Sequence, residues 1–406
     1  MAIRVYALFN NKARRWKEGR KNLLSHVSAA LEGNTSPLVW VHCSSLGEFE
    51  QGRPIIELLR EMYSDHKIVL TFFSPSGYEV QKNYKNADHV FYLPLDSEQN
   101  AEKFISALNP SLVIFVKYEY WYHYLKKIHE EKIPLLLVSA VFNPSQPFFK
   151  WYGGIHKKML NFFNHIFVQD QSSFDLLKKI ADLPVSVSGD TRFDRVWEIS
   201  RHTAEIPFIE SFCNKKQVLI AGSTWPEDEE ALLYAFQQPG LENYKLIIAP
   251  HEINAVNLSG LRSLFADVIF YSELNDGEKA RKARYLVIDN IGMLSRLYQY
   301  ATVTYVGGGF SKSGIHNVLE AAVWGKPVLF GPNYKKYIEA VDLISAGGGK
   351  SFTNKEELTR ILEHYFTNPD SYKKAAEAAK EFIEVNRGAT DQIMGYIQEN
   401  RLLTNL

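Results

Sequence analysis

The sequence of 406 residues contains only two cysteines, Cys43 and Cys213. Two thiols are too few for a disulfide framework or a cysteine-based zinc site, so a reducing cytoplasm is the simple interpretation. The 46 basic and 46 acidic residues cancel to a net charge of zero. Because a protein that coats nucleic acid needs a strong positive field, the composition argues against nucleic acid as a partner.

Long apolar runs are also absent. No stretch reaches the roughly 18 uninterrupted apolar residues expected of a membrane span, and no cleavable signal is evident. Residues 1–30 nevertheless carry a single acidic residue, Glu18, and apolar side chains lie among seven basic residues: Arg4, Lys12, Arg14, Arg15, Lys17, Arg20 and Lys21. Such a segment can lie on an anionic membrane surface, where each basic residue contributes about 1 kcal/mol. A solvated charged helix is the alternative.

The length of the chain exceeds what one core usually supports, so we expect two domains. Short apolar segments alternate with helical patterns, which is typical of parallel sheets. We expect strands in two series, at 38–42, 68–73, 112–116, 135–138 and 165–168, and then at 218–221, 245–249, 285–288, 303–306 and 327–330. The predicted organisation is a basic segment at 1–30, an α/β domain at 31–200, a linker at 201–216 and a second α/β domain at 217–406. Two doubly wound, Rossmann-like domains facing one cleft result.

The segment from Val306 to Pro332 reads as a strand, a glycine-rich loop, a helix and another strand. Gly307, Gly308 and Gly309 let the backbone turn closely around a ligand. We expect the helix to begin near His316 and Asn317, with its first N–H groups available to a phosphate. Glu320, one turn later, is then placed to accept hydrogen bonds from ribose hydroxyls. An ordinary tight turn with a solvated Glu320 is the alternative.

The same segment resembles the G-G-H-N-x-x-E signature of the 3-deoxy-D-manno-octulosonic acid (Kdo) transferases of lipopolysaccharide synthesis. Six further matches precede this signature in the chain, in the order expected of that family. They are WVHCSSLGE at 40–48, TFFSPSG at 71–77, YLPLD at 92–96, EYW at 119–121, GDTRFD at 189–194 and the pair Ser223-Thr224. Seven ordered matches over nearly the whole chain argue against coincidence.

The chain also departs from the family pattern at several positions. Lys117 stands where the family commonly has a second glutamate before Glu119, and a P-R-H motif is reduced to Pro250-His251. The other differences are Gly309 for a serine, Ile315 for a glycine and Arg192 for a lysine. These departures affect individual nucleotide and acceptor contacts rather than the overall resemblance.

The resemblance implies the GT-B glycosyltransferase architecture, with the acceptor on the N-terminal domain and CMP-Kdo on the C-terminal domain. Glu48 is the candidate general base, because it begins the helix that follows the strand at 38–42. A carboxylate there can take the proton of an acceptor hydroxyl, a contribution of about 100- to 10,000-fold. A helix-start glutamate that complements the dipole is the alternative. Ser45 and Gly47 suit the tight turn before it and are expected at the acceptor.

The leaving phosphate needs positive partners. Backbone N–H groups from Gly314 to Asn317, together with Lys312, are the candidates for this stabilisation. No D-x-D motif is present and a monophosphate leaving group carries less charge than a pyrophosphate, so we predict no catalytic metal and no cofactor. His316 as a zinc ligand is the alternative, but no second His or Cys lies at ligand spacing.

The remaining site candidates follow other predicted strands. Ser223 and Thr224 are expected at the nucleotide phosphate, with a helix cap as the alternative, and His251 at the base or ribose. Glu119 is expected to position the acceptor. Lys117 and Arg192 are expected to pair with the acceptor phosphate or the donor carboxylate, unless surface salt bridges account for them. The aromatic run from Tyr118 to Tyr124 suits sugar or acyl chains, or core packing.

The sequence therefore predicts a Kdo transferase that acts on a lipid A precursor at the cytoplasmic face of the bacterial inner membrane. Members of the family often begin with a hydrophobic anchor, so a longer form of this chain with such an anchor is left open. A GT-B enzyme using a UDP-sugar, either a transferase or a 2-epimerase, is one alternative. A noncatalytic lipid- or nucleotide-binding protein is the other.

Overall fold

The computed structural model describes residues 10–202 and 204–403. Arg4 and the apolar residues of the first nine positions lie outside this range, and the rest of the predicted basic segment lies within it. The chain divides into two compact units. The N-terminal unit comprises the residues up to 195 together with those from 387 onward, and the C-terminal unit comprises residues 196–386.

The N-terminal unit is built on a parallel sheet of seven strands in the order β3-β2-β1-β4-β5-β6-β7. Successive side chains of a strand point to opposite faces, and in β1 both kinds are buried, as a sheet covered on both sides requires. The strands are β1 (Leu38–Cys43), β2 (Lys67–Phe72), β3 (His89–Tyr92), β4 (Leu112–Val116), β5 (Leu135–Ala140), β6 (His165–Val168) and β7 (Val185–Val187).

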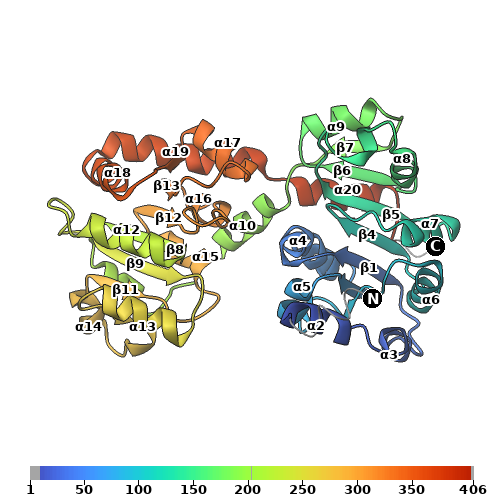
Figure 1. The fold of residues 1–406 in the computed structure, drawn as a ribbon, viewed down its shortest axis with the longest axis horizontal. Helices are drawn as coiled ribbons and strands as arrows, with labels where there is room; N and C mark the ends of the chain where they lie inside the picture. The colour runs from blue at the N-terminus through green and yellow to red at the C-terminus, as the bar shows by residue number, and fades with distance from the viewer. Residues whose placement is uncertain (1–9, 203, 404–406) are drawn as a thin grey trace. The chain divides into compact units, whose positions relative to one another are not determined.

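Helices cover both faces of this sheet (Figure 1). One core lies against α4 and the last helix, α20, and the other against α3, α6, α7 and α8. The helices are α2 (Asn11–Glu18), α3 (Leu23–Ala30), α4 (Leu46–Met62), α5 (Pro75–Gln81), α6 (Glu98–Leu108), α7 (Tyr122–Glu130), η1 (Pro147–Phe149), α8 (Gly154–Leu160), α9 (Gln171–Lys178), α10 (Arg192–Arg201), which continues into the C-terminal unit, and α20 (Ala389–Glu399).

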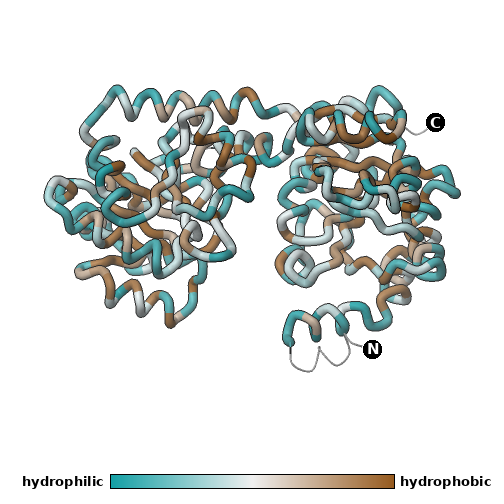
Figure 2. Tube along the Cα trace, turned by 45° about the horizontal axis from the view of Figure 1, so that its top comes forward, coloured by the Kyte–Doolittle hydropathy of each residue, from teal (hydrophilic) through white to brown (hydrophobic). Residues whose placement is uncertain are grey.

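The C-terminal unit repeats this plan with a second seven-stranded parallel sheet, ordered β10-β11-β9-β8-β12-β13-β14. Its strands are β8 (Val218–Thr224), β9 (Lys245–Pro250), β10 (Ile269–Phe270), β11 (Tyr285–Val287), β12 (Val303–Val306), β13 (Val328–Phe330) and β14 (Gly349–Ser351). In both units the hydrophobic residues lie mainly in the interior, while the outer segments are more hydrophilic (Figure 2).

The helices of the C-terminal unit complete the second doubly wound fold. They are α11 (Ile209–Cys213), α12 (Pro226–Phe236), α13 (Ala255–Leu264), η2 (Tyr271–Glu273), α14 (Gly277–Lys282), α15 (Leu294–Leu297), η3 (Tyr298–Tyr300), α16 (Leu319–Ala322), α17 (Ile338–Ala346), α18 (Lys355–Thr367) and α19 (Pro369–Asn386).

Each sheet reverses its strand order at one point. In the N-terminal unit β1 pairs with both β2 and β4, and in the C-terminal unit β8 pairs with both β9 and β12. The connections on either side of such a point leave the sheet toward opposite faces and open a crevice at the carboxyl ends of the strands. The loops after β1, β4, β8 and β12 are therefore where each unit is expected to bind ligands.

The unit boundaries differ from the predicted domain boundaries, most clearly at the linker and at the last helix. The predicted linker 201–216 contains α11, whose Ile209 and Phe212 are buried in the C-terminal unit. Helix α20, expected in the C-terminal domain, packs on α4 of the N-terminal unit through Ile393 and Ile397. Asp194 holds the start of this helix, since its carboxylate accepts hydrogen bonds from the Gly388 N–H (2.5 Å) and the Thr390 N–H (2.7 Å).

Within residues 10–202 and 204–403, no helix is both long and apolar enough to cross a membrane.

Candidate functional site

The switch point of the N-terminal unit contains a buried polar chain. His42 near the end of β1 and Glu119 after β4 are 0% and 2% exposed, and His42 Nε2 lies 2.9 Å from Glu119 Oε2. On its other side, His42 Nδ1 lies 2.8 Å from Thr71 Oγ1, and the Trp40 indole N–H donates a hydrogen bond to this oxygen. The Trp121 indole N–H donates to the same Glu119 oxygen. Glu119 therefore lies beneath the surface, where it fixes His42 and Trp121.

Ser45 and Glu48 lie directly beyond His42. Ser45 is the N-cap residue of α4, with the extended backbone typical of that position, and Glu48 is in the first turn. The Ser45 hydroxyl donates to Glu48 Oε2, and both residues are half-buried. This bond fixes the carboxylate at the switch point. Glu48 therefore has the helix-start position that is the alternative to a catalytic role.

The other acceptor candidates are placed differently. Gly47 is exposed in the first turn of α4. Lys117, directly after β4, is half-buried with a φ of +70°, a conformation that side chains rarely adopt outside constrained sites. The Arg192 guanidinium pairs with Asp190 through two hydrogen bonds of 2.9 and 2.7 Å, so the salt-bridge alternative describes it.

In the C-terminal unit, Ser223 and Thr224 end β8. Ser223 is half-buried with a φ of +55°. The Thr224 hydroxyl is buried and donates to Glu229 Oε1 at 2.9 Å, so it has no proton to offer a phosphate in this arrangement. Burial raises the pKa of Glu229 to about 7, against the opposing hydrogen bond from Thr224. Thr224 thus closes the turn that leads into α12.

A buried carboxylate ties the glycine-rich loop to this turn. Asp228 Oδ2 accepts hydrogen bonds from the N–H groups of Gly308 (2.8 Å) and Trp225 (2.9 Å), and Oδ1 accepts one from the Tyr305 hydroxyl (2.5 Å). Burial raises the pKa of Asp228 despite these donors. A Cβ on Gly307 would lie 2.3 Å from the Ser223 carbonyl oxygen, so glycine is required there by the approach of β8 itself.

Three rings form a stack beside this loop. His251 stacks on Trp225 and on His316, with centroid distances of 4.9 and 4.2 Å. The Trp225 indole N–H donates to His316 Nε2 at 3.2 Å. Burial, with a contribution from His251, lowers the pKa of His316 to about 4, so the ring is neutral at pH 7. Because Nε2 accepts, Nδ1 carries the proton and is a hydrogen-bond donor.

The helix after the glycine-rich loop differs from the prediction. Helix α16 begins at Leu319, not near His316, and has only four residues. The N–H groups of Gly314 and His316 donate to the carbonyls of Ser311 (3.1 Å) and Gly307 (3.2 Å), and that of Ile315 donates to Asn333. The predicted cradle of free backbone donors from Gly314 to Asn317 is therefore wrong at these three positions. The loop curls on itself because Gly308 and Gly314 have φ values of +90° and +78°.

The polar side chains after this loop lie together. Asn317 Nδ2 donates to Glu320 Oε1 at 3.1 Å, and both side chains are half-buried. Lys312 is exposed earlier in the loop. Among the residues that the structure describes, no group of three or more His, Cys, Asp or Glu side chains is arranged to hold a metal ion.

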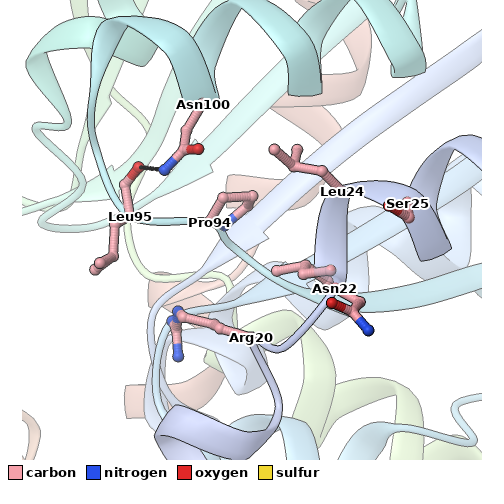
Figure 3. Close-up of a pocket in the computed structure, with 8 residues that line it drawn as sticks. Arg20, Asn22, Leu24, Ser25, Pro94, Leu95 and Asn100 are labelled. Carbon is pink, nitrogen blue, oxygen red and sulfur yellow. Dashed lines mark hydrogen bonds between the residues drawn. The ribbon is translucent and has the colours of Figure 1, made fainter. Parts of the chain in front are cut away.

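A separate pocket of about 260 Å³ lies in the N-terminal unit, where α2 meets α3 (Figure 3). The Arg20 guanidinium at its edge is enclosed by Trp16, Phe73 and Tyr92, and it donates to the carbonyls of Leu93 (3.0 Å) and Phe73 (2.8 Å). Burial lowers its pKa to about 10. Arg20 thus fastens the helix to the strand ends. The pocket is lined by Arg20, Asn22, Leu23, Leu24, Ser25, Pro94, Leu95 and Asn100.

Comparison with known proteins identifies the relatives of this chain. Residues 14–195 match the family model described as 3-deoxy-D-manno-octulosonic-acid transferase (kdotransferase). The 3-deoxy-D-manno-octulosonic acid transferase of Aquifex aeolicus is 28% identical over 337 residues, which are 81% of this chain and 86% of that protein. The family model covers nearly all of the N-terminal unit, and relatives named Kdo transferases align with most of the chain. This similarity agrees with the glycosyltransferase that the motifs predict.

A second relative is longer than this chain. The bifunctional glycosyltransferase/methyltransferase of Fusobacterium nucleatum is 26% identical over 90% of this chain, which spans 55% of that protein. For the fold, the UDP-N-acetylglucosamine 2-epimerase of Neisseria meningitidis superposes with a TM-score of 0.59 at 16% identity, covering 89% of this chain and all of that one. The two seven-stranded units thus have the GT-B fold expected of the Kdo transferase family.

Three residues at these switch points were not among the predicted site residues. His42 lies inside the W-x-H-x-x-S-x-G-E segment, so the motif contained the signal. Trp225 and Asp228 follow Ser223 and Thr224 within one helical turn, and their pattern reads only as a helix start. Their contacts depend on the distant loop at 305–316, which no local pattern reveals.

Proposed function

We propose that this chain is an inverting glycosyltransferase that moves Kdo from CMP-Kdo to a lipid A precursor of the lipid IVA type. The observation that carries the proposal is the position of the family's W-x-H-x-x-S-x-G-E segment. It ends β1 at the switch point of its sheet and presents Glu48 in the first turn of α4. Similarity to the Kdo transferase family supports the choice of sugar and nucleotide.

In the proposed reaction Glu48 is the general base. Its carboxylate takes the proton of an acceptor hydroxyl while that oxygen bonds to the anomeric carbon of Kdo. The bond from the anomeric carbon to the phosphate oxygen breaks, and CMP leaves with the electron pair. The transition state has oxocarbenium character, and displacement from the opposite face inverts the configuration. The Ser45 hydroxyl bond to Glu48 supports this role, because it fixes the carboxylate before the acceptor arrives.

Donor binding is proposed for the C-terminal unit. The neighbouring Asn317 and Glu320 side chains suit the ribose hydroxyls, and the His316 Nδ1–H suits a phosphate oxygen. The stacked His251 and Trp225 rings suit the cytosine ring. Ser223, Gly307, Gly308, Gly314 and Lys312 complete the proposed donor site, with Thr224 beneath it. Neutral and cationic donors then stabilise the leaving CMP without a metal ion.

Acceptor binding is proposed for the N-terminal unit. Ser45, Gly47 and Lys117 border the carboxyl ends of β1 and β4, and a lysine there can pair with an acceptor phosphate. Glu119 and Arg192 are proposed to position this site through His42 and Asp190. Glu119 was expected to position the acceptor, and Arg192 to pair with the acceptor phosphate or the donor carboxylate. Burial of Glu119 favours an indirect role.

We further propose that the protein acts as a peripheral enzyme at the cytoplasmic face of the inner membrane. Five basic side chains of the predicted segment are exposed and available to anionic lipid: Lys12, Arg14, Arg15, Lys17 and Lys21. Arg20, predicted as part of the same basic surface, is enclosed by aromatic rings and does not contribute.

The experiment that tests this function identifies the product. The purified chain is incubated with freshly generated CMP-Kdo and a lipid A precursor, and the lipid is analysed by mass spectrometry. The proposal predicts one Kdo added to the acceptor for each CMP released, at a rate that a chelator does not change. Consumption of a UDP-sugar instead, or turnover without a lipid acceptor, would favour the other GT-B alternatives. Nucleotide or lipid binding with no turnover of any donor would indicate a noncatalytic binding protein.

A further inference from the structure

The N-terminal unit exposes an aromatic–lysine surface between β5 and β6. Trp151 is 96% exposed, Tyr152 58% and Ile155 54%. Lys150, Lys157 and Lys158 flank them in the sequence. Trp151 is the most exposed large hydrophobic side chain that the structure describes. Exposed apolar groups in one short segment, here the loop and the first turn of α8, mark interaction sites.

A rigid base supports these exposed rings. Phe142 and Phe148 are buried beneath the loop, and Phe148 packs edge-on against Tyr120 at 4.6 Å. The backbone closes two successive turns, with the Lys150 N–H donating to the Pro147 carbonyl (3.1 Å) and the Gly153 N–H to the Lys150 carbonyl (3.0 Å). The loop therefore holds Trp151 outward at little further entropy cost on binding.

The charge of the region selects the partner. No acidic residue occurs anywhere between Glu131 and Asp170, whereas this stretch contains Lys132 and the three lysines of the surface. Lysines beside exposed tryptophan and tyrosine match an anionic bilayer, where aromatic rings lie at the headgroup level and cations pair with lipid phosphates. A protein partner would require an acidic, apolar counterpart instead.

The location of this surface relates it to the proposed acceptor site. The loop leaves the carboxyl end of β5, and the carboxyl ends of all strands in a parallel sheet lie at one edge. Arg20 fastens α2 to the carbonyls of Phe73 and Leu93, which follow β2 and β3 at the same edge. In the sheet order, β1 lies between these elements, and β3 and β5 are four strand spacings, or about 19 Å, apart. Glu48 after β1 is thus flanked by a basic helix and an aromatic–lysine loop.

We propose that the aromatic–lysine surface docks the N-terminal unit on the headgroup–acyl boundary of an anionic membrane. Trp151, Tyr152 and Ile155 enter the boundary, and Lys150, Lys157 and Lys158 pair with lipid phosphates. The exposed basic face of α2 forms the second contact. This inference deepens the proposed function, because it explains how a lipid-anchored acceptor reaches Glu48 without leaving the bilayer.

The test measures vesicle binding in the absence of donor and acceptor. The full chain and the triple variant Trp151→Ser, Tyr152→Ser, Ile155→Ser are sedimented with phosphatidylcholine vesicles that contain phosphatidylglycerol. Because all three side chains are exposed, the variant is expected to fold, and circular dichroism checks this. The matched control replaces two exposed apolar residues of the C-terminal unit, Val256→Ser and Ile291→Ser.

We expect the triple variant to lose about tenfold or more in partitioning and the control to lose less than about twofold. Each Lys→Gln change in the surface costs about fivefold with anionic vesicles and little with pure phosphatidylcholine. Quenching of wild-type fluorescence by lipids brominated in the acyl chain, absent in Trp151→Phe, would support insertion. Equal partitioning of triple variant and wild type would overturn the proposal, as would a Trp151-dependent dimer that leaves vesicles unbound.

This test fails separately from the proposed function. If the chain binds vesicles through Trp151 and yet transfers no Kdo, the docking proposal stands and the transferase proposal is overturned. In the opposite outcome, the wild type and the triple variant transfer Kdo to a detergent-dispersed acceptor at the same rate while neither binds vesicles. That result would support the transferase proposal and overturn the docking proposal.

Discussion

At the residue scale, the main feature is the contact between His42 near the end of β1 and Glu119 after β4. The two side chains lie 2.9 Å apart and are almost fully buried. Removal of one member of such a pair leaves the other buried without its partner. The stability lost in this way exceeds the stability that the intact pair contributes. The pair also supports Trp121, and its first residue is three positions before Ser45. Its contribution to activity is therefore expected to come from positioning the loop that presents Glu48.

We predict that Glu119→Ala lowers the free energy of unfolding by about 3 kcal/mol and reduces kcat more than it changes KM. Glu119→Gln keeps an acceptor for Trp121 and is expected to recover most of the stability. Urea unfolding and steady-state kinetics on both variants make the comparison. A Glu119→Ala protein as stable and as active as its parent would show that the buried chain has no positioning role.

Glu229 provides a pH-dependent contribution to stability. Burial raises its pKa to about 7 in the folded chain, above the unfolded value, so the folded state holds the proton more tightly. Stability from this group is complete below about pH 4.5 and is lost as the pH rises toward 7. We predict that the free energy of unfolding of Glu229→Gln, relative to that of the parent, is higher at pH 8 than at pH 5. The difference between the two pH values is expected to be on the order of 2 kcal/mol.

The matched control for this prediction is Glu230→Gln, because Glu230 is exposed on the same helix. Thermal unfolding at the two pH values, for parent and both variants, separates Glu229 from the other titrating groups. An identical pH dependence in the parent and Glu229→Gln would contradict the assignment.

At the scale of elements, the central strands of both sheets were predictable because they are short, mostly apolar and bounded by polar loops. The strands at 112–116, 165–168 and 303–306 have the predicted bounds. The edge strands β3, β7, β10 and β14 were not predicted. An edge strand needs fewer buried residues, and β14, Gly349–Ser351, has no fully buried one, so its sequence carries no apolar signal.

The candidate site was predictable to the extent that it is local. Ser45 and Glu48 belong to one turn, so their motif predicted that they lie together. The start of the helix after the glycine-rich loop was misplaced, because the curl of the loop depends on contacts of Ile315 with Asn333 and of Gly308 with Asp228. Such long-range hydrogen bonds leave no periodic pattern in the sequence.

Asp194 gives the G-D-T-R-F-D segment a structural role at this scale. Its carboxylate accepts from the Thr390 hydroxyl (2.7 Å) as well as from two N–H groups at the start of α20. We predict that Asp194→Ala lowers the free energy of unfolding by about 2–3 kcal/mol and speeds amide hydrogen exchange in α20. Urea unfolding and hydrogen exchange of the helix measure the two effects. Asp391→Ala, an exposed change in the same turn, should cost less than about 1 kcal/mol. Equal costs for the two changes would show that Asp194 does not hold the helix.

At the scale of the whole molecule, the chain builds two similar units and then returns to the first with α20. Each unit has its polar loops at the switch point of its sheet, with a fixed carboxylate in the N-terminal unit and a ring stack beside a glycine-rich loop in the C-terminal unit. This division assigns different consequences to substitutions in the two units. Changes at Glu48 should affect the rate of transfer, and changes at Trp225 or Asn317 should affect nucleotide affinity.

The most direct test of the account is the kcat of Glu48→Gln measured beside its affinity for CMP. Glu61→Gln, an exposed change on the same helix, is the matched control. We predict that Glu48→Gln lowers kcat by about 100- to 10,000-fold while the Kd for CMP stays within about twofold of the parent, and that Glu61→Gln changes neither. A Glu48→Gln enzyme with a kcat within a few-fold of the parent would contradict the assignment of Glu48 as the base.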